Sequence, residues 1–161
     1  MSMEGRTLVF AFEPPSCRDL AARLVPKDSH YVPLSSKESR IREFVRTLSP
    51  HYPAIIGIGL SRQLRAAYRF EPRFVNRFRN KPIEVSGPEF LPQGISSGST
   101  GASQVTWLYC NLVSYLIHMK LQAERSDVRF YFIHINPRYA PVENIADLLS
   151  GALQQMQIQV G

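Results

Sequence analysis

The sequence contains few cysteines, and this scarcity excludes two common kinds of small protein. Only two cysteines, Cys17 and Cys110, occur among 161 residues. They lie far apart and provide neither the paired spacing of a zinc site nor the density of a secreted disulfide scaffold. We therefore expect both thiols to be reduced and no metal to be bound by them.

Long apolar runs are also missing from the chain. No stretch approaches the roughly 18 to 20 uninterrupted apolar residues of a membrane-spanning helix, and residues 1–6 lack the apolar region of a signal peptide. We therefore expect a soluble, cytoplasmic protein that has no membrane partner. The length and the 44% apolar composition predict one domain over residues 1–161 with a single core.

Acidic residues are outnumbered by basic ones, and the formal net charge of +6 raises the question of a nucleic-acid partner. Seven cations interleaved with aromatic residues crowd into residues 62–81. Such a segment could contact phosphates and stack on bases, but Pro72 would break a continuous helix there. A solvated or inter-subunit face is the favoured interpretation, and nucleic acid is the less favoured partner. The cations are Arg62, Arg65, Arg69, Arg73, Arg77, Arg79 and Lys81.

Short apolar runs alternate with amphipathic stretches along the chain. The runs are nearly continuous, which is typical of parallel strands buried on both faces, and the stretches carry apolar residues at helical spacing. Residues 86–106, rich in Gly, Ser, Pro and Thr, predict a loop. The alternation predicts an α/β fold with helices on both faces of a mostly parallel sheet. The predicted strands are residues 7–12, 54–59 and 128–135, and the predicted helices are residues 17–24, 36–48, 107–121 and 142–156.

Cys110 and His134 are the candidate catalytic pair. Cys110 lies near the start of a predicted helix, where the helix dipole should lower the pKa of its thiol. His134 lies at the carboxyl end of the next predicted strand, an edge at which ligand sites gather. A thiol beside an imidazole can begin nucleophilic acyl transfer. Taken alone, one Cys and one His are weak support, and a structural role for Cys110 is the stronger interpretation.

Five short segments in the right order strengthen the catalytic interpretation. Cys110 stands in Tyr-Cys-Asn with Tyr115 five residues later, and His134 stands in Phe-Ile-His-Ile followed by Asn-Pro. Upstream, residues 8–14 read Leu-Val-Phe-Ala-Phe-Glu-Pro, residues 56–60 read Ile-Gly-Ile-Gly-Leu, and Glu71 precedes Asn76 by five residues. Together these segments resemble the motifs of pyroglutamyl peptidase I, also called pyrrolidone-carboxylate peptidase, a family of cysteine peptidases.

This resemblance implies a three-layer α/β/α sandwich with a mixed, mostly parallel sheet. It also implies an omega-peptidase that removes an N-terminal pyroglutamyl residue without a metal or organic cofactor. Cys110 would be the nucleophile, His134 the base and then the acid, and Glu71 the carboxylate that orients the imidazole. The substrate, a peptide or small amide, would contact Phe12, Leu108 and Tyr109. A homo-oligomer of this chain is a possible partner state that the sequence leaves open.

The sequence departs from the family pattern around the expected substrate pocket. The loop after Glu13-Pro14 lacks an aromatic residue, larger residues replace a small run before Cys110, and the chain is short between Glu71 and Cys110. Lys81 stands roughly where an arginine is expected. A changed specificity, or an inactive descendant that acts as a binding module, therefore remains an alternative. The other candidates, Cys17, His30, His51 and His118, are interpreted as structural or surface residues.

Overall fold

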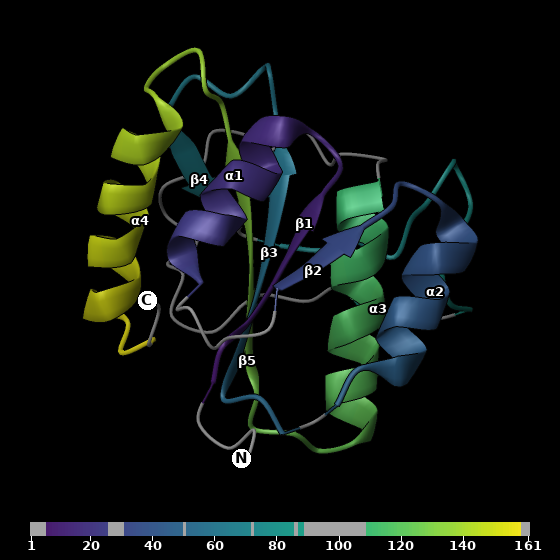
Figure 1. Cartoon of the computed structure of the whole chain (residues 1–161). Coiled ribbons are helices and arrows are strands. Elements are labelled where there is room, and N and C mark those ends of the chain that lie inside the picture. Colours follow the sequence, from purple (N-terminus) through teal and green to yellow (C-terminus); the bar gives the residue numbers. More distant parts are fainter. Residues whose placement is uncertain are drawn as a thin grey trace.

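A computed structural model describes residues 6–25, 31–49, 51–71, 73–85, 87–88 and 109–158. Within these ranges the chain forms five strands and four helices, which alternate for most of its length (Figure 1). The strands are β1 (Leu8–Phe12), β2 (Tyr31–Leu34), β3 (Ala54–Leu60), β4 (Tyr68–Phe70) and β5 (Arg129–Ile135). The helices are α1 (Pro15–Leu24), α2 (Glu38–Thr47), α3 (Tyr109–Ala123) and α4 (Val142–Gln155).

The strands form one sheet in the order β2-β1-β3-β5-β4. The first four of these are parallel to their neighbours, and β4 pairs with β5 in the antiparallel direction at one edge. The predicted mixed, mostly parallel sheet is thus confirmed. Because the parallel strands share one direction, their carboxyl ends meet at one edge of the sheet, where Phe12, Leu60 and Ile135 lie.

Two pairs of helices cover the two faces of the sheet (Figure 1). Helices α2 and α3 pack on the face that carries Phe10 and Phe132, and α1 and α4 pack on the face that carries Ile56 and Ile133. With helices on both faces, every second residue of a strand is buried on one side and the rest on the other. This explains why β1 reads Leu-Val-Phe-Ala-Phe without a polar residue, and it confirms the three-layer sandwich.

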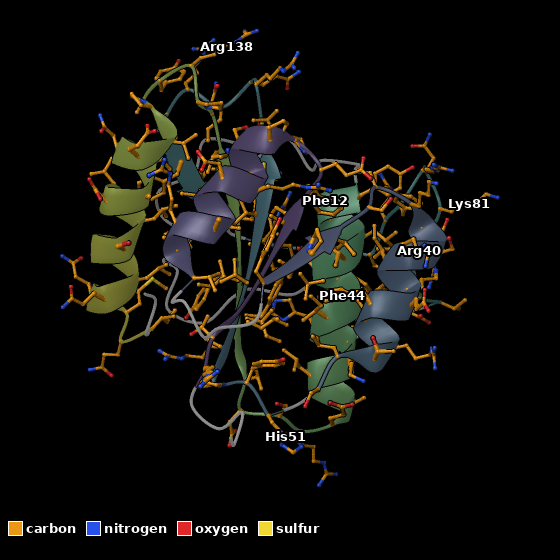
Figure 2. The ribbon with its side chains drawn as sticks, viewed as in Figure 1. Phe12, Arg40, Phe44, His51, Lys81 and Arg138 are labelled. Carbon is orange, nitrogen blue, oxygen red and sulfur yellow. The ribbon has the colours of Figure 1, made fainter. Side chains whose placement is uncertain are left out.

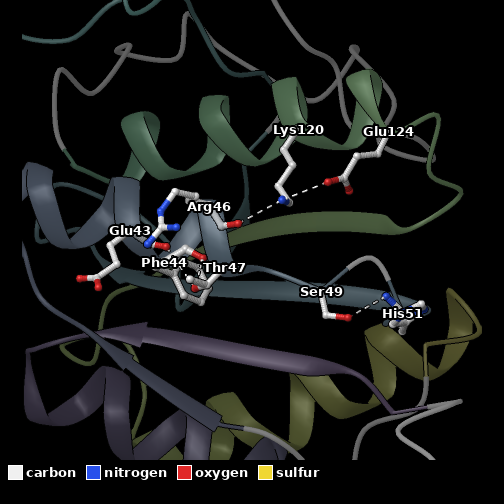
Figure 3. A network of polar contacts seen from close by, with 8 residues as sticks. All are labelled: Glu43, Phe44, Arg46, Thr47, Ser49, His51, Lys120 and Glu124. Atoms are coloured by element: carbon white, nitrogen blue, oxygen red, sulfur yellow. Dashed lines mark hydrogen bonds and ion pairs between the residues drawn. The ribbon is translucent and has the colours of Figure 1, made fainter.

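The amphipathic helices are held against the sheet by their apolar faces. Ile41 and Val45 of α2 are buried, as are Leu149 and Leu153 of α4. Polar contacts then join neighbouring helices at the surface. Lys120 of α3 donates to the carbonyl oxygen of Arg46 at 3.3 Å and pairs with Glu124 at 3.0 Å (Figure 3). The first of these contacts occupies a carbonyl in the last turn of α2, which otherwise would have no partner inside the helix.

Two short edge strands were not predicted. β2 contains Pro33, which cannot donate a ladder hydrogen bond, and β4 is only three residues long with an arginine at its centre. Both therefore lack the apolar run that signals a buried strand. The predicted loop over residues 86–106 lies almost wholly outside the described residues. In the described ranges, no helix combines the length and apolar character needed to cross a membrane.

Candidate active site

The candidate site lies at the carboxyl end of β5, beside β3. His134 is paired in register with Gly59 of β3, and its side chain is 2% exposed. It shares a sheet face with Phe132, two residues earlier, whose ring lies 5.1 Å from the imidazole in an edge-on arrangement. The imidazole is therefore held by a regular strand on the face that α3 covers.

Glu71 reaches the imidazole from the end of the neighbouring strand. Its backbone N–H donates to the carbonyl of Phe132 at 2.8 Å, which extends the β4–β5 pairing by one residue. The carboxylate Oε1 lies 2.5 Å from Nδ1 of His134. Because an ionised carboxylate can only accept, the proton of this hydrogen bond belongs to Nδ1, and Nε2 is the acceptor whenever the imidazole is neutral.

A second donor holds the same carboxylate oxygen. Nη2 of Arg69 lies 2.9 Å from Oε1 of Glu71. Burial by itself would raise the pKa of the Glu71 carboxyl, but the hydrogen bonds and positive charges of His134 and Arg69 outweigh it and hold that pKa below its ordinary value. The carboxylate is thus ionised at neutral pH although only 8% of the residue is exposed.

The thiol of Cys110 lies over the same part of the sheet. Cys110 is in the first turn of α3, and its Sγ would be 2.9 Å from a Cβ built on Gly59, the register partner of His134. Since a glycine stands there, the thiol can approach the strand backbone closely. The fold therefore brings the three predicted catalytic side chains to one region of one sheet face.

The predicted lowering of the Cys110 pKa is wrong. Burial raises the pKa of this thiol well above its ordinary value, and the negative charge of Glu71 raises it further. Desolvation disfavours the thiolate by more than the start of the helix favours it. The resting thiol is therefore protonated at neutral pH, and any attack needs a base that removes its proton.

Phe12 and Tyr109, two of the three predicted substrate contacts, lie in the same apolar cluster as Cys110. Phe12 ends β1 near the first turn of α3 (Figure 2), is 4% exposed, and has its ring 6.3 Å from that of Phe132. The Tyr109 hydroxyl accepts a hydrogen bond from Nη2 of Arg79 at 2.7 Å, and its ring lies 5.5 Å from Phe78. Leu108, the third predicted substrate contact, lies outside the described residues.

A tight turn delivers Arg79 to Tyr109. Phe78 and Lys81 exchange two backbone hydrogen bonds, of 2.8 and 3.0 Å, and the two residues between them have positive φ angles of 48° and 63°. This is the geometry of a two-residue hairpin. The aromatic and hydrogen-bond contacts of Arg79 stabilise a backbone conformation that arginine rarely adopts.

Two asparagines in the matched motifs hold the neighbouring chain segments. Asn111, directly after the cysteine, accepts from the backbone N–H of Val75 at 3.0 Å and donates to the carbonyls of Val75 and Arg77, each at 2.9 Å. Oδ1 of Asn76 accepts from the backbone N–H of Glu84 at 2.8 Å. No role was predicted for either asparagine, although both lie inside the matched motifs.

Arg69 is the site residue that the sequence analysis missed. It was counted among the surface cations of residues 62–81, but its guanidinium turns toward Glu71. The sequence alone does not show that Arg69 belongs to the site, because Arg69 is brought opposite His134 only by the pairing of β4 with β5. The described part of the basic segment contains a strand and a hairpin turn and no helix, so its arginines do not form the single stripe of a continuous helix.

The remaining candidates lie elsewhere. Cys17 is fully buried on the opposite face of the sheet, and burial raises the pKa of its thiol to about 12. His118 lies about two helical turns from Cys110 and packs against the rings of both Phe74 and Phe130, and burial lowers its pKa to about 4. His51 is exposed at the other end of the molecule from Phe12 (Figure 2), and His30 is outside the described residues. No group of three or more His, Cys, Asp or Glu side chains in the described part of the chain could hold a metal ion.

Comparison with known proteins gives matches to solved structures. A single-residue variant of the pyrrolidone carboxyl peptidase from the hyperthermophile Pyrococcus furiosus has a TM-score of 0.71 at 19% identity, over 92% of this chain and 96% of that chain. The pyrrolidone carboxyl peptidase from Thermococcus litoralis has a TM-score of 0.70 at 18% identity, over 94% of this chain and 92% of that chain. This chain has the pyrrolidone carboxyl peptidase fold.

The shared pyrrolidone-peptidase fold confirms the resemblance inferred from the five motifs at the level of architecture. No family model and no curated protein sequence matches the chain. At 18–19% identity the likeness establishes the fold alone. The roles of Glu71, Cys110 and His134 must therefore be argued from their own geometry.

Proposed function

We propose that this protein is a cysteine peptidase that cleaves an N-terminal pyroglutamyl, or related N-terminal, amide bond. The observation that carries the proposal is the hydrogen bond of 2.5 Å between Nδ1 of His134 and Oε1 of Glu71, next to a thiol that lies over the register partner of that histidine. A carboxylate, an imidazole and a thiol in this order are the parts of a nucleophilic triad.

In the proposed reaction His134 moves protons between Cys110 and the substrate. Nε2 takes the thiol proton as Sγ attacks the amide carbonyl, and Glu71 stabilises the imidazolium that forms. The backbone N–H of Cys110 is a candidate donor to the oxyanion. The imidazolium then gives its proton to the departing amine, which leaves an acyl thioester. A water molecule, deprotonated by Nε2, attacks the thioester, and Cys110 regains its proton as the acid is released.

The substrate side of the proposal rests on the apolar surroundings of the thiol. Phe12 and Phe132 lie together near Cys110, and Tyr109 directly precedes Cys110 in the chain. Such walls suit a small ring or an apolar acyl group, with the scissile carbonyl held by backbone groups. The fold neighbours act on pyrrolidone carboxyl groups, as their names state, which makes the pyroglutamyl amide the first substrate to test.

The decisive assay is thiol-dependent release of a fluorescent amine. Pyroglutamyl-aminomethylcoumarin and a panel of other N-terminal aminoacyl coumarin amides would be incubated with the wild-type protein and with Cys110→Ala. The matched control is Cys17→Ala, which removes the other free thiol from the opposite face of the sheet. We expect release by the wild type and by Cys17→Ala, and none above background by Cys110→Ala. A folded wild-type protein that releases nothing from the whole panel would exclude catalysis and leave a binding module with a peptidase fold.

A further inference from the structure

Arg69 occupies a position that directly influences the candidate triad. In the antiparallel β4–β5 pair it stands opposite His134, so both side chains lie on the same face of the sheet. A cation placed directly across from the catalytic base would ordinarily disfavour the protonated form of that base. Glu71 explains this arrangement, because its carboxylate pairs with both Arg69 and His134.

Arg69 and His134 bind the same oxygen of Glu71. Nη2 of Arg69 lies 2.9 Å from Oε1, and Nδ1 of His134 lies 2.5 Å from it. Each donor comes from a different strand, so two strand backbones together fix the position of one carboxylate oxygen. The side chain of Glu71 is 11% exposed and that of Arg69 is 34% exposed, so this contact is shielded from water more than an ordinary surface ion pair.

The charge state of Glu71 determines which imidazole nitrogen can act. An ionised carboxylate accepts from Nδ1–H and leaves Nε2 free to take the thiol proton. A protonated carboxyl could donate to Nδ1 instead, which would place the imidazole proton on Nε2 and remove the base. Burial favours that protonated form, and the charges of Arg69 and His134 oppose it.

The groups that face Glu71 come from three elements. Arg69 lies on β4, the strand that Glu71 directly follows, and His134 lies on β5. The thiol of Cys110 on α3 is close enough for the charge of Glu71 to raise its pKa. The adjoining strand β3 offers Gly59, which has no side chain. Among the described residues, Arg69 is thus the permanent positive charge that contacts the carboxylate.

We propose, on the basis of the function proposed above, that Arg69 is a positioning residue that keeps Glu71 ionised and aimed at Nδ1 of His134. It acts through Glu71 and does not itself touch the substrate. Its effect should therefore be seen in the pH dependence of the site more than in the affinity for substrate.

The test compares Arg69→Met and Arg69→Gln, which remove the charge, with Arg69→Lys, which keeps it. The control is Arg65→Met, because Arg65 is an exposed arginine of the same segment. The Glu71 carboxyl is titrated by carbon-13 NMR and assigned by comparison with Glu71→Gln. We expect both neutral variants to raise its midpoint by about one pH unit, Arg69→Lys to keep most of the wild-type value, and Arg65→Met to match the wild type.

Activity provides the second readout. The acid limb of kcat/KM reports protonation of the coupled Glu71–His134 pair, and it should move to higher pH in the neutral variants with little change in KM. An unchanged Glu71 midpoint in whichever neutral variant folds, or an equal shift in Arg65→Met, would overturn the inference even if the wild type hydrolyses amides. Conversely, a raised midpoint in a protein that hydrolyses nothing would uphold the coupling and refute the peptidase.

Discussion

Gly59→Ala tests the placement of the thiol, on which the whole candidate site depends. The added Cβ would lie 2.9 Å from Sγ of Cys110 and 2.9 Å from Cζ of Phe132. Ordinary contacts between such atoms are about 3.5 to 4.0 Å, so roughly 0.6 to 1 Å of movement is needed. The Phe132 ring has little room, because the rings of Phe10, Phe12 and His134 lie within 6.3 Å of its own.

The thiol is therefore the group that should give way. Overpacking of this kind costs about 1 to 3 kcal/mol, which for a chain of this size lowers the melting temperature by roughly 2 to 10 °C. Rotation of the Cys110 side chain away from Gly59 would relieve the clash but displace Sγ from its position over the register partner of His134. The assay is run at a temperature at which Gly59→Ala remains folded. There we expect its thiol-dependent hydrolysis to fall far more than its loss of stability explains.

The matched control is Gly151→Ala on helix α4. A Cβ at Gly151 meets no atom within 4 Å, and alanine is the better helix former, so this change should stabilise by up to about 1 kcal/mol and leave hydrolysis unchanged. Urea unfolding measures the stability of each variant, and coumarin release measures the site. Wild-type stability and wild-type hydrolysis in Gly59→Ala would refute the placement of Sγ over Gly59.

Three further changes address the charges and hydrogen bonds around the site. Glu71→Gln should lower kcat/KM by roughly 10³- to 10⁴-fold in steady-state assays. Because the pKa of Glu71 is lowered in the native state, the ionised carboxylate stabilises that state above the unfolded pKa, and this stabilisation is lost as pH falls through the folded pKa. The same variant should therefore flatten the acid limb of the pH dependence of urea stability, below about pH 5; an unflattened curve would argue against this linkage. Burial lowers the pKa of His118 to about 4, so between pH 7 and 5 this imidazole gains a proton only in the unfolded state. The free energy of unfolding of the wild type should therefore fall by up to about 2 kcal/mol over this range, whereas that of His118→Phe should not. Equal losses in the two proteins would show that His118 is not the cause. Asn111→Ala removes three hydrogen bonds to Val75 and Arg77 and should cost about 2 to 4 kcal/mol of unfolding free energy; a cost below about 1 kcal/mol would mean that water replaces them.

The sequence predicted the centre of the fold better than its edges. Strands β1, β3 and β5 are buried on both faces, and such burial produces continuous apolar runs that can be recognised locally. The edge strands β2 and β4 owe their conformation to pairing with a neighbour, which leaves no such pattern in the residues themselves. Helix limits shifted by a few residues at most, as in α2, predicted at 36–48 and found at Glu38–Thr47.

Part of the candidate site could be found from the sequence because its residues occur in local motifs. Glu71, Cys110 and His134 were selected in this way, and the fold places them at one sheet edge. Arg69 could not be found, because its relation to His134 exists only through strand register. The pKa of Cys110 was predicted in the wrong direction for a similar reason, since desolvation depends on neighbours from the whole fold.

A raised thiol pKa changes how the proposed chemistry must begin. Cys110 cannot rest as a stored thiolate, and the nearby charge of Glu71 disfavours that state further. In the proposed mechanism, proton transfer from Sγ to His134 therefore becomes favourable only as the carbonyl carbon takes up the developing charge of sulfur. Cys17 also has a raised thiol pKa, so in the proposed mechanism His134, acting as the base for Cys110, is what distinguishes the two cysteines. Alkylation at neutral pH, which measures thiolate, should be slow for both, whereas hydrolysis should depend on Cys110 alone.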